Sequence, residues 1–313
     1  MKGTINFFVK VGSYLIKGYA LKSQSGARFA SKEEEQVLFH RRHKGVLIDG
    51  KNKRLSEKDS FEHIAIIAKP GMGKTSSYII PNILDKAKKR CSIIVTDPSG
   101  EIFDNTSAFM QSKGFNIKVF NPDNIKQSSR FNPFAGLNHR DIIEIEKICQ
   151  SIILSKYGKG KDAMWNEGAV SIIEILAKCL ACGSPKHLNL PNINYLLNLF
   201  GVDGAALDDW VSDNSINPDD EDDESIVNAW IGLTKNNVNM LTSYATIAKT
   251  ALKQLNNRHL QRLLTDNDFD FDEFRKQKTI CYLIIPAHQQ DYYQFLIDLF
   301  YTRFFATMMS KLP

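Results

Sequence analysis

The chain has 313 residues, which is enough for one large domain or two ordinary ones at roughly 150 residues each. Hydrophobic residues make up 43% of it and charged residues 24%, so a disordered chain and a fibrous repeat are excluded and a buried core is possible. The net charge of +5 leaves open both an ordinary surface and a basic face for nucleic acid. Five cysteines without regular spacing are typical of a reducing cytoplasm.

The first 60 residues are basic and begin with an apolar stretch. Residues 5–21 are interrupted by Lys10 and Lys17, and they fall short of the ~20 apolar residues that a membrane-spanning helix needs. No secretory signal peptide is visible in them. The two lysines lie on one helical face. The stretch therefore predicts either an interfacial helix on an anionic membrane or, more simply, a helix packed on its own domain.

Strands and helices then alternate. The isoleucine-rich run 63–68 is typical of a buried parallel strand, and a glycine-containing loop and a helix from about Thr75 follow it. Two more buried strands are expected at 92–96 and 117–120, joined by a helix over 101–114. This alternation predicts a parallel sheet.

A phosphate-binding motif follows the first expected strand. The pattern G-x-x-x-x-G-K-[ST] is met with alanine in its first position. Its glycines let backbone N–H groups surround phosphate oxygens closely, and the following helix points its N-terminus at the same anion. Lys74 is expected to reach the β- and γ-phosphates, and the Thr75 hydroxyl to bind Mg²⁺. ATP and Mg²⁺ are therefore the expected cofactors. The residues expected around the nucleotide are Ala68, Lys69, Pro70, Gly71, Met72, Gly73, Lys74, Thr75 and Ser76.

Hydrolysis also needs an acidic residue at the end of a neighbouring strand. One expected strand ends in an acid, Asp97, with Glu101 four residues later, whereas the strand expected at 279–285 ends in Pro-Ala-His. Open α/β sheets bind their ligands at the carboxyl ends of strands. Asp97 and Glu101 therefore join Lys74 as candidate catalytic residues, and the alternative is a structural role at the start of the next helix.

Residues 141–264 show helical periodicity and almost no strand signal. A strand pattern returns at 279–285, and a last helix is expected at 292–309. Because the sheet must close across the helical block, we interpret that block as an insertion. The predicted division is an N-terminal basic segment (1–60), the first part of a nucleotide-binding domain (61–140), an all-helical inserted domain (141–264) and the second part of the nucleotide-binding domain (265–313).

Two smaller patterns lie inside the helical block. Nine acidic residues fall between positions 208 and 224, around Asn217-Pro218, which favours a solvated loop over a partner-docking or substrate-repelling surface. Cys179 and Cys182 form a C-x-x-C without a second pair at zinc-ribbon spacing, and His187 is the one nearby further ligand. Structural thiols are the simpler interpretation, and a metal site is the alternative.

Further segments carry a family likeness in their order and spacing. They are G-A-R-F-A-S at 26–31, the phosphate loop with I-I-P-N-I-L at 79–84, D-P-S-G-E at 97–101, R-F-N-P-F at 130–134, Trp165, and Y-L-I-I-P at 282–286. Together they resemble the coupling proteins of conjugation and type IV secretion, often called TraG-like, over residues 26–313. In that family the segment that matches residues 97–101 reads D-P-K-G-E, and the segment that matches residues 130–134 reads R-F-N-P-L.

The resemblance implies an α/β fold, a RecA-like P-loop domain with a mainly parallel sheet interrupted by an all-α subdomain. It also implies a homo-oligomer, usually a hexameric ring with ATP between subunits, at the cytoplasmic face of the bacterial inner membrane. Secretion-channel proteins are the implied partners, and DNA or a secreted protein is the implied substrate.

The chain departs from the family in three places. Only residues 5–21 could stand for the usual transmembrane helices, Ser99 replaces a lysine, and the chain stops about where the family's Walker B strand would begin. We therefore expect a truncated gene product, one half of a split protein or an expressed fragment, and we expect it to bind ATP and to hydrolyse it poorly alone.

Three functions are compatible with these observations. The first is an ATP-binding motor subunit that delivers DNA or protein to a type IV secretion channel. The second is another RecA-like DNA translocase, against which the R-F-N-P-F element and the helical insertion count. The third is a nucleotide-binding, non-hydrolysing adaptor subunit, which the missing Walker B acid favours.

Overall fold

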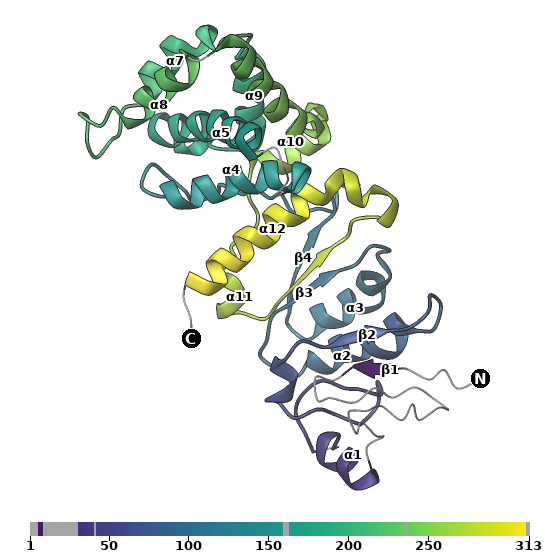
Figure 1. The fold of residues 1–313 in the computed structure, drawn as a ribbon. Helices are drawn as coiled ribbons and strands as arrows, with labels where there is room; N and C mark the ends of the chain where they lie inside the picture. Colours follow the sequence, from purple (N-terminus) through teal and green to yellow (C-terminus); the bar gives the residue numbers. More distant parts are fainter. Residues whose placement is uncertain (1–5, 9–30, 41, 159–162, 236, 311–313) are drawn as a thin grey trace. The chain divides into compact units, whose positions relative to one another are not determined.

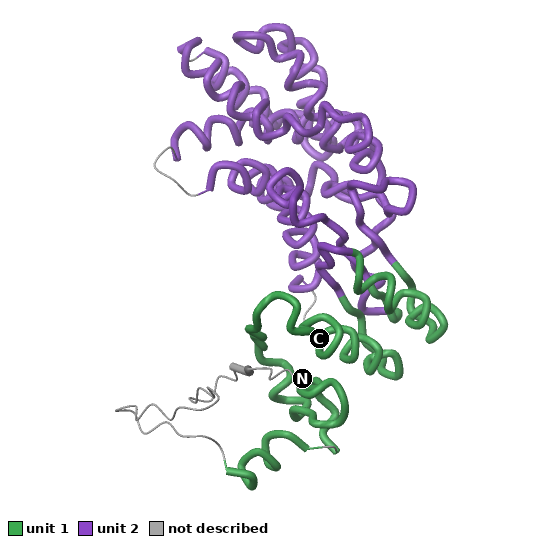
Figure 2. Tube along the Cα trace, turned by 90° about the vertical axis from the view of Figure 1, so that its right-hand side faces the viewer, with its two compact units in different colours: residues 1–93, 100–117, 277–280 green, residues 94–99, 118–276, 281–313 purple. Residues whose placement is uncertain are grey.

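The structure is a computed structural model (Figure 1) that describes residues 6–8, 31–40, 42–158, 163–235 and 237–310. The chain divides into two compact units, coloured separately in Figure 2. Unit 1 comprises residues 1–93, 100–117 and 277–280, and unit 2 comprises residues 94–99, 118–276 and 281–313. The domain limits predicted from the sequence remain a prediction.

Within the described residues, the main sheet has three strands in the order β3-β5-β4. These strands are β3 (Ile93–Thr96), β4 (Asn116–Phe120) and β5 (Thr279–Leu283). Backbone hydrogen bonds run from Asn116 to Lys278 and from Ile284 to Phe120, so the residue numbers of both strands rise together, as they do in a parallel pair. All five residues of β5 are buried, as expected of a central strand covered on both faces. The α/β class with a parallel sheet is thus confirmed.

The strand before the phosphate loop is not part of this sheet. β2 (Ala65–Ile67) pairs antiparallel with β1 (Asn6–Phe8) in a separate two-stranded sheet, and Ile67 is 61% exposed. The prediction of a buried parallel strand at 63–68 was wrong, because an apolar run this short does not specify which backbone edge it will pair with. The helix predicted over 5–21 is also wrong where the structure describes it, since residues 6–8 form a strand. Its remainder, with Lys10 and Lys17, lies outside the described residues.

Unit 1 also contains short helices. They are α1 (Lys32–Leu38), a 3₁₀ turn (Asp59–Phe61), a π-helical turn (Thr75–Ile79), α2 (Ile80–Lys86) and α3 (Glu101–Ser112). Ser31 caps α1 in a capping box with Glu34, whose side chain accepts from the Ser31 N–H at 2.7 Å. The remainder of the segment 26–31 lies outside the described residues.

Unit 2 is built from helices between β4 and β5 and one long helix after β5. The helices are α4 (Ile142–Tyr157), α5 (Ala163–Gly183), α6 (Leu190–Leu199), α7 (Asp208–Asn214), α8 (Ser225–Thr234), α9 (Val238–Ala251), α10 (Arg258–Thr265), α11 (Glu273–Lys276) and α12 (Gln290–Ser310). Short 3₁₀ turns lie at Pro185–His187, Ala205–Leu207, Lys253–Asn256 and Ala287–Gln289. The apolar α5 contacts α4 and α6 to α9 and forms the centre of this helical core (Figure 1). Among the helices of the described residues, none is long and apolar enough to cross a membrane.

The acidic run at 208–224 is only partly a loop. Its first three acids lie in α7, where Asp208 accepts a hydrogen bond from the Trp230 indole at 2.7 Å. Residues 215–224, called the acidic loop below, connect α7 to α8. The prediction of one continuous solvated loop was therefore wrong for 208–214, because Trp210 and Val211 pack that part of the run against the helical core.

Candidate phosphate-binding site

The phosphate loop needs glycine at two positions. Gly71 and Gly73 have φ angles of 76° and 75°, in the left-handed region that other residues rarely adopt. A Cβ on Gly73 would also lie 3.0 Å from the Ser77 hydroxyl oxygen, whereas a Cβ on Gly71 would meet nothing within 4 Å. Gly71 is therefore required by the backbone alone, and Gly73 by the backbone and the close approach of Ser77.

The Lys74 side chain folds back across the loop that precedes it. Its ammonium donates hydrogen bonds to the carbonyl oxygens of Ala68 at 2.8 Å and Lys69 at 3.1 Å. These neutral acceptors hold the cation against the loop backbone. An anion placed there would gain the stronger charge-assisted hydrogen bonds that an ammonium forms with phosphate oxygens.

The helix after the loop begins with a π-helical turn. Thr75 is its first residue, and the N–H of Ile80 bonds the carbonyl of Thr75, five residues back. Pro81 has no N–H and cannot bond the Ser77 carbonyl as an α-helical residue would. This missing donor accounts for the wider turn. The helix predicted from about Thr75 is confirmed, with a π-helical rather than an α-helical start.

A short hairpin, residues 45–55, is held against α2 by two side chains. The amide of Asn82 pairs with the backbone of Leu47, accepting from its N–H at 2.8 Å and donating to its carbonyl at 2.9 Å. The Arg54 guanidinium makes two hydrogen bonds of 2.7 and 2.6 Å to the Asp85 carboxylate. The two arms of this hairpin meet at an isolated antiparallel bridge between Leu47 and Arg54.

Glycine is again required where the hairpin turns. Gly50 has a φ of 70°, and a Cβ there would lie 2.2 Å from the carbonyl oxygen of Ser77. That carbonyl is the one that Pro81 deprives of its α-helical donor. The turn of the hairpin therefore packs directly on the irregular part of the helix after the phosphate loop.

The Arg54–Asp85 pair is an ion pair that is largely buried. The two side chains are only 19% and 20% exposed, and the hydrogen bonds from Arg54 hold the pKa of Asp85 below its usual value. Sequence analysis missed this contact because Arg54 stands in a basic stretch. A usable signal was present: Asn82 and Asp85 lie three residues apart and so share one face of the helix.

The two candidate acids lie in different units. Asp97 follows β3 in unit 2 and is 1% exposed; its N–H bonds the Leu283 carbonyl, and its carboxylate accepts from the Ser99 hydroxyl at 3.4 Å. Glu101 is exposed and opens α3 in unit 1, after Gly100, which has a φ of 75° and offers no side-chain cap. The placement of both carboxylates at the phosphate loop stays a prediction.

The C-x-x-C pair lies at the end of α5. Cys179 is buried, and burial raises the pKa of its thiol to about 12, which disfavours the thiolate that a metal ion needs. Among the described residues, no three His, Cys, Asp or Glu side chains are grouped so that they could hold a metal ion.

Comparison with known proteins gives the chain a family. The model of the type IV secretory system conjugative DNA transfer family matches residues 21–313. A search of curated proteins finds no relative of this chain.

Solved structures share the fold. The plasmid coupling protein TrwB in complex with ADP and Mg²⁺ aligns with a TM-score of 0.61 and 15% identity, over 91% of this chain and 61% of that one. TrwB with the non-hydrolysable GTP analogue GDPNP aligns with a TM-score of 0.55 and 15% identity, over 79% of this chain and 52% of that one. The unbound monoclinic form of the coupling protein TrwBdeltaN70 aligns with a TM-score of 0.55 and 14% identity, over 78% of this chain and 51% of that one.

At these identities the structural likeness shows the fold alone, and the chain spans only 51% to 61% of the length of these coupling proteins. The family match does not depend on them, since it covers residues 21–313 and contains both the phosphate loop and the helical block. The chain therefore belongs to the conjugative DNA transfer family of type IV secretory systems.

Proposed function

We propose that this chain is an ATP-binding motor subunit of a conjugative transfer machine, which delivers DNA or a secreted protein to a type IV secretion channel. The observation that carries the proposal is the phosphate loop, with left-handed backbone at Gly71 and Gly73 and the Lys74 ammonium held across it, in a chain of this family. The solved TrwB complexes with ADP and Mg²⁺ and with nucleotide analogues support a nucleotide as the ligand.

The residues suit a magnesium nucleotide. Backbone N–H groups of residues 68–76 other than Pro70, together with the Lys74 ammonium, would hold the phosphate oxygens. The Thr75 hydroxyl is an oxygen ligand of the kind that Mg²⁺ prefers. Asp97 and Glu101 would order Mg²⁺ or its water molecules. When bound, the metal neutralises charge on the phosphates.

The site would work within a homo-oligomeric ring, hexameric by family resemblance, at the cytoplasmic face of the bacterial inner membrane. In ring motors, an arginine from a neighbouring subunit commonly helps to neutralise the charge on the γ-phosphate. Arg130 is a poor candidate, because its guanidinium already donates to Asp266 at 2.6 Å and to Asp268 at 2.8 and 3.1 Å. Those bonds tie the R-F-N-P-F segment to residues 266–268.

The test is calorimetric titration of the purified chain with ATP, with and without Mg²⁺, followed by ATP turnover with and without single-stranded DNA. A motor subunit should bind ATP with a Mg²⁺ requirement and hydrolyse it faster when DNA is present. ATP binding without turnover under any condition would favour the adaptor alternative. Absence of ATP binding would exclude both.

A further inference from the structure

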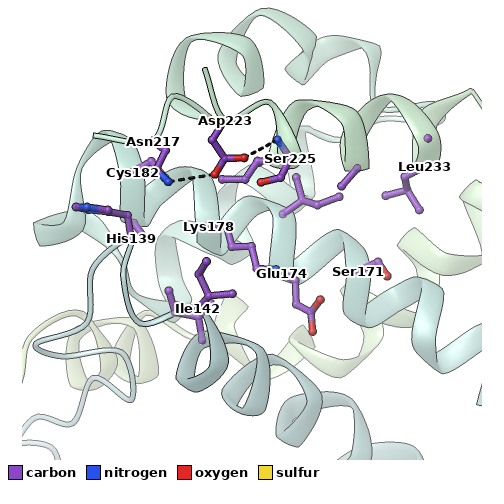
Figure 3. Close-up of a pocket in the computed structure, with 16 residues that line it drawn as sticks. His139, Ile142, Ser171, Glu174, Lys178, Cys182, Asn217, Asp223, Ser225 and Leu233 are labelled. Carbon is purple, nitrogen blue, oxygen red and sulfur yellow. Dashed lines mark hydrogen bonds between the residues drawn. The ribbon is translucent and has the colours of Figure 1, made fainter. Parts of the chain in front are cut away.

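The helical unit contains a cavity that the proposed function does not use. It has a volume of about 470 Å³ and lies between α4, α5, α8 and the acidic loop (Figure 3). Much of its lining is apolar, from Ile142, Ile145, Ile175, Ile226 and Leu233. This volume falls within the roughly 300–1,000 Å³ of typical small-ligand sites.

One carboxylate in this cavity has no hydrogen-bond or ion-pair partner among the described residues. Glu174 of α5 points into it (Figure 3), and within the part of the chain that the structure describes its carboxylate forms no hydrogen bond or ion pair. The nearest cation on the same helix, Lys178, donates instead to Glu146 of α4 at 2.6 Å. Lys178 is thus already neutralised. A half-buried carboxylate in an apolar cavity is costly unless a cation joins it.

A second carboxylate stands at the rim and is held in place. Asp223 accepts hydrogen bonds from the Asn217 amide at 3.1 Å and from the Ser225 N–H at 3.0 Å (Figure 3), and these bonds lower its pKa. The acidic loop is anchored through Asp219, which accepts from Arg140 at 2.6 Å and lies 2.9 Å from a ring nitrogen of His139. The two basic side chains that line the cavity, Lys178 and His139, are therefore already paired, with Glu146 and Asp219 respectively.

An apolar lining with two carboxylates complements a cation that is carried on an aliphatic chain. We propose that this cavity binds an aliphatic ammonium group, whose chain packs on the apolar lining and whose charge pairs with Glu174, with Asp223 at the rim. The ammonium could belong to a free alkylamine or to a lysine side chain of a partner protein. The proposal does not depend on nucleotide binding by the phosphate loop.

Proton linkage gives the site a distinctive signature. Burial raises the pKa of Glu174 to about 7, with Lys178 opposing and Glu146 adding to that shift. A cation binds the ionised carboxylate, so binding at pH 7 should release about half a proton. Between pH 6 and pH 8 the ionised fraction rises about tenfold, and the affinity should rise by the same factor.

The experiment is calorimetric titration of the purified chain with n-pentylamine at pH 6, 7 and 8, in two buffers with different ionisation enthalpies. 1-Pentanol, which has the same chain without the charge, is the matched ligand. Glu174→Gln keeps the shape and removes the charge. Asp222→Asn, which removes a charge from an exposed residue of the acidic loop outside the cavity lining, is the matched variant.

We expect saturable binding of n-pentylamine that releases protons and is at least about tenfold weaker in Glu174→Gln, with no proton release and no change in Asp222→Asn. N-acetyl-lysine methylamide identifies the source: tighter binding than n-pentylamine indicates a lysine side chain, and weaker binding a free amine. Leu233→Trp, which fills the cavity without changing its charge, should abolish binding. No saturable binding to the native chain, or equal affinity in Glu174→Gln, would overturn the proposal.

Discussion

At the scale of single residues, Lys74 is the side chain on which the phosphate loop depends most directly. Lys74→Ala should lower ATP affinity by at least about tenfold, because charge-assisted hydrogen bonds to phosphate are worth roughly 1.5–3 kcal/mol. Lys88→Ala, which removes an exposed lysine of the same unit, should bind ATP as the native chain does. Calorimetry that finds equal affinity for both variants would contradict the assignment of the loop.

The two acids can be distinguished by the effect of Mg²⁺. If Asp97 orders the metal, Asp97→Asn should reduce ATP affinity in the presence of Mg²⁺ and leave it unchanged in EDTA, with hydrolysis reduced about 10²–10³-fold. Glu101→Gln tests the exposed acid in the same way. If Asp97 is instead purely structural, Asp97→Asn should lower the free energy of unfolding and leave the dependence of ATP affinity on Mg²⁺ unchanged. Asp97 is buried, so the free energy of unfolding should be measured as well.

At the scale of elements, the hairpin 45–55 and α2 are joined by the Arg54–Asp85 pair. Arg54→Ala should lower the free energy of unfolding by about 1.5–3 kcal/mol, since it leaves a half-buried carboxylate without its donor. Urea unfolding of Arg54→Ala, Asp85→Ala and the double variant measures the coupling. Additive effects of the two single substitutions would show that the pair contributes nothing beyond its separate side chains.

The same pair has a defined pH dependence. Asp85 has a folded-state pKa below its unfolded value of about 4, so the pair stabilises the fold fully above about pH 4. This contribution decreases as the pH falls through the depressed pKa. The stability difference between the native chain and Arg54→Ala should therefore be constant from pH 5 to 7 and shrink below pH 4.

The pH dependence of stability that we expect from Glu174 on α5 has the opposite sign. Its folded-state pKa of about 7 lies above the ordinary value of 4.5, so folding favours the protonated carboxyl. As the pH rises above 4.5 the native chain loses stability relative to Glu174→Gln, and the loss is complete above pH 7. Denaturation curves should show Glu174→Gln as the more stable protein at pH 8 and as equal at pH 4. A less stable Glu174→Gln at pH 8 would mean that Lys178 pairs with Glu174 in solution.

At the scale of the whole molecule, an aromatic cluster in unit 2 brings together segments from both sides of the helical block. Phe131 of the R-F-N-P-F segment packs against Phe120 of β4, Phe269 and Phe300 of α12, with ring centroids 5.8, 6.0 and 5.4 Å apart. Phe131→Ala should lower the free energy of unfolding by about 3–5 kcal/mol because Phe131 is fully buried. Phe131→Leu should lower the free energy of unfolding by less, because leucine refills part of the lost volume. A small effect of Phe131→Ala in urea unfolding would show that the cluster adapts around the lost ring.

What the sequence alone determined is local in origin. Glycine at 71 and 73, the helix after them, the strands at β3, β4 and β5, and the helices over 142–265 follow from backbone preferences and from the period of apolar residues. The order of the motifs also indicated the family. These features depend on neighbours within a few residues, or on spacing along the chain, and both can be read directly from the sequence.

Tertiary structure decided which distant groups meet. Only the fold shows that β2 pairs outside the main sheet and that Arg54 bonds Asp85. Only the fold shows that Glu174 faces a cavity, where no described residue pairs with it, while Lys178 pairs with Glu146. Pairing across a sheet or between helices depends on which backbone edge or side chain arrives from elsewhere in the chain. A charge in the sequence, such as Arg54 in its basic stretch, has the same residue letter whether it ends in solvent or in a half-buried ion pair.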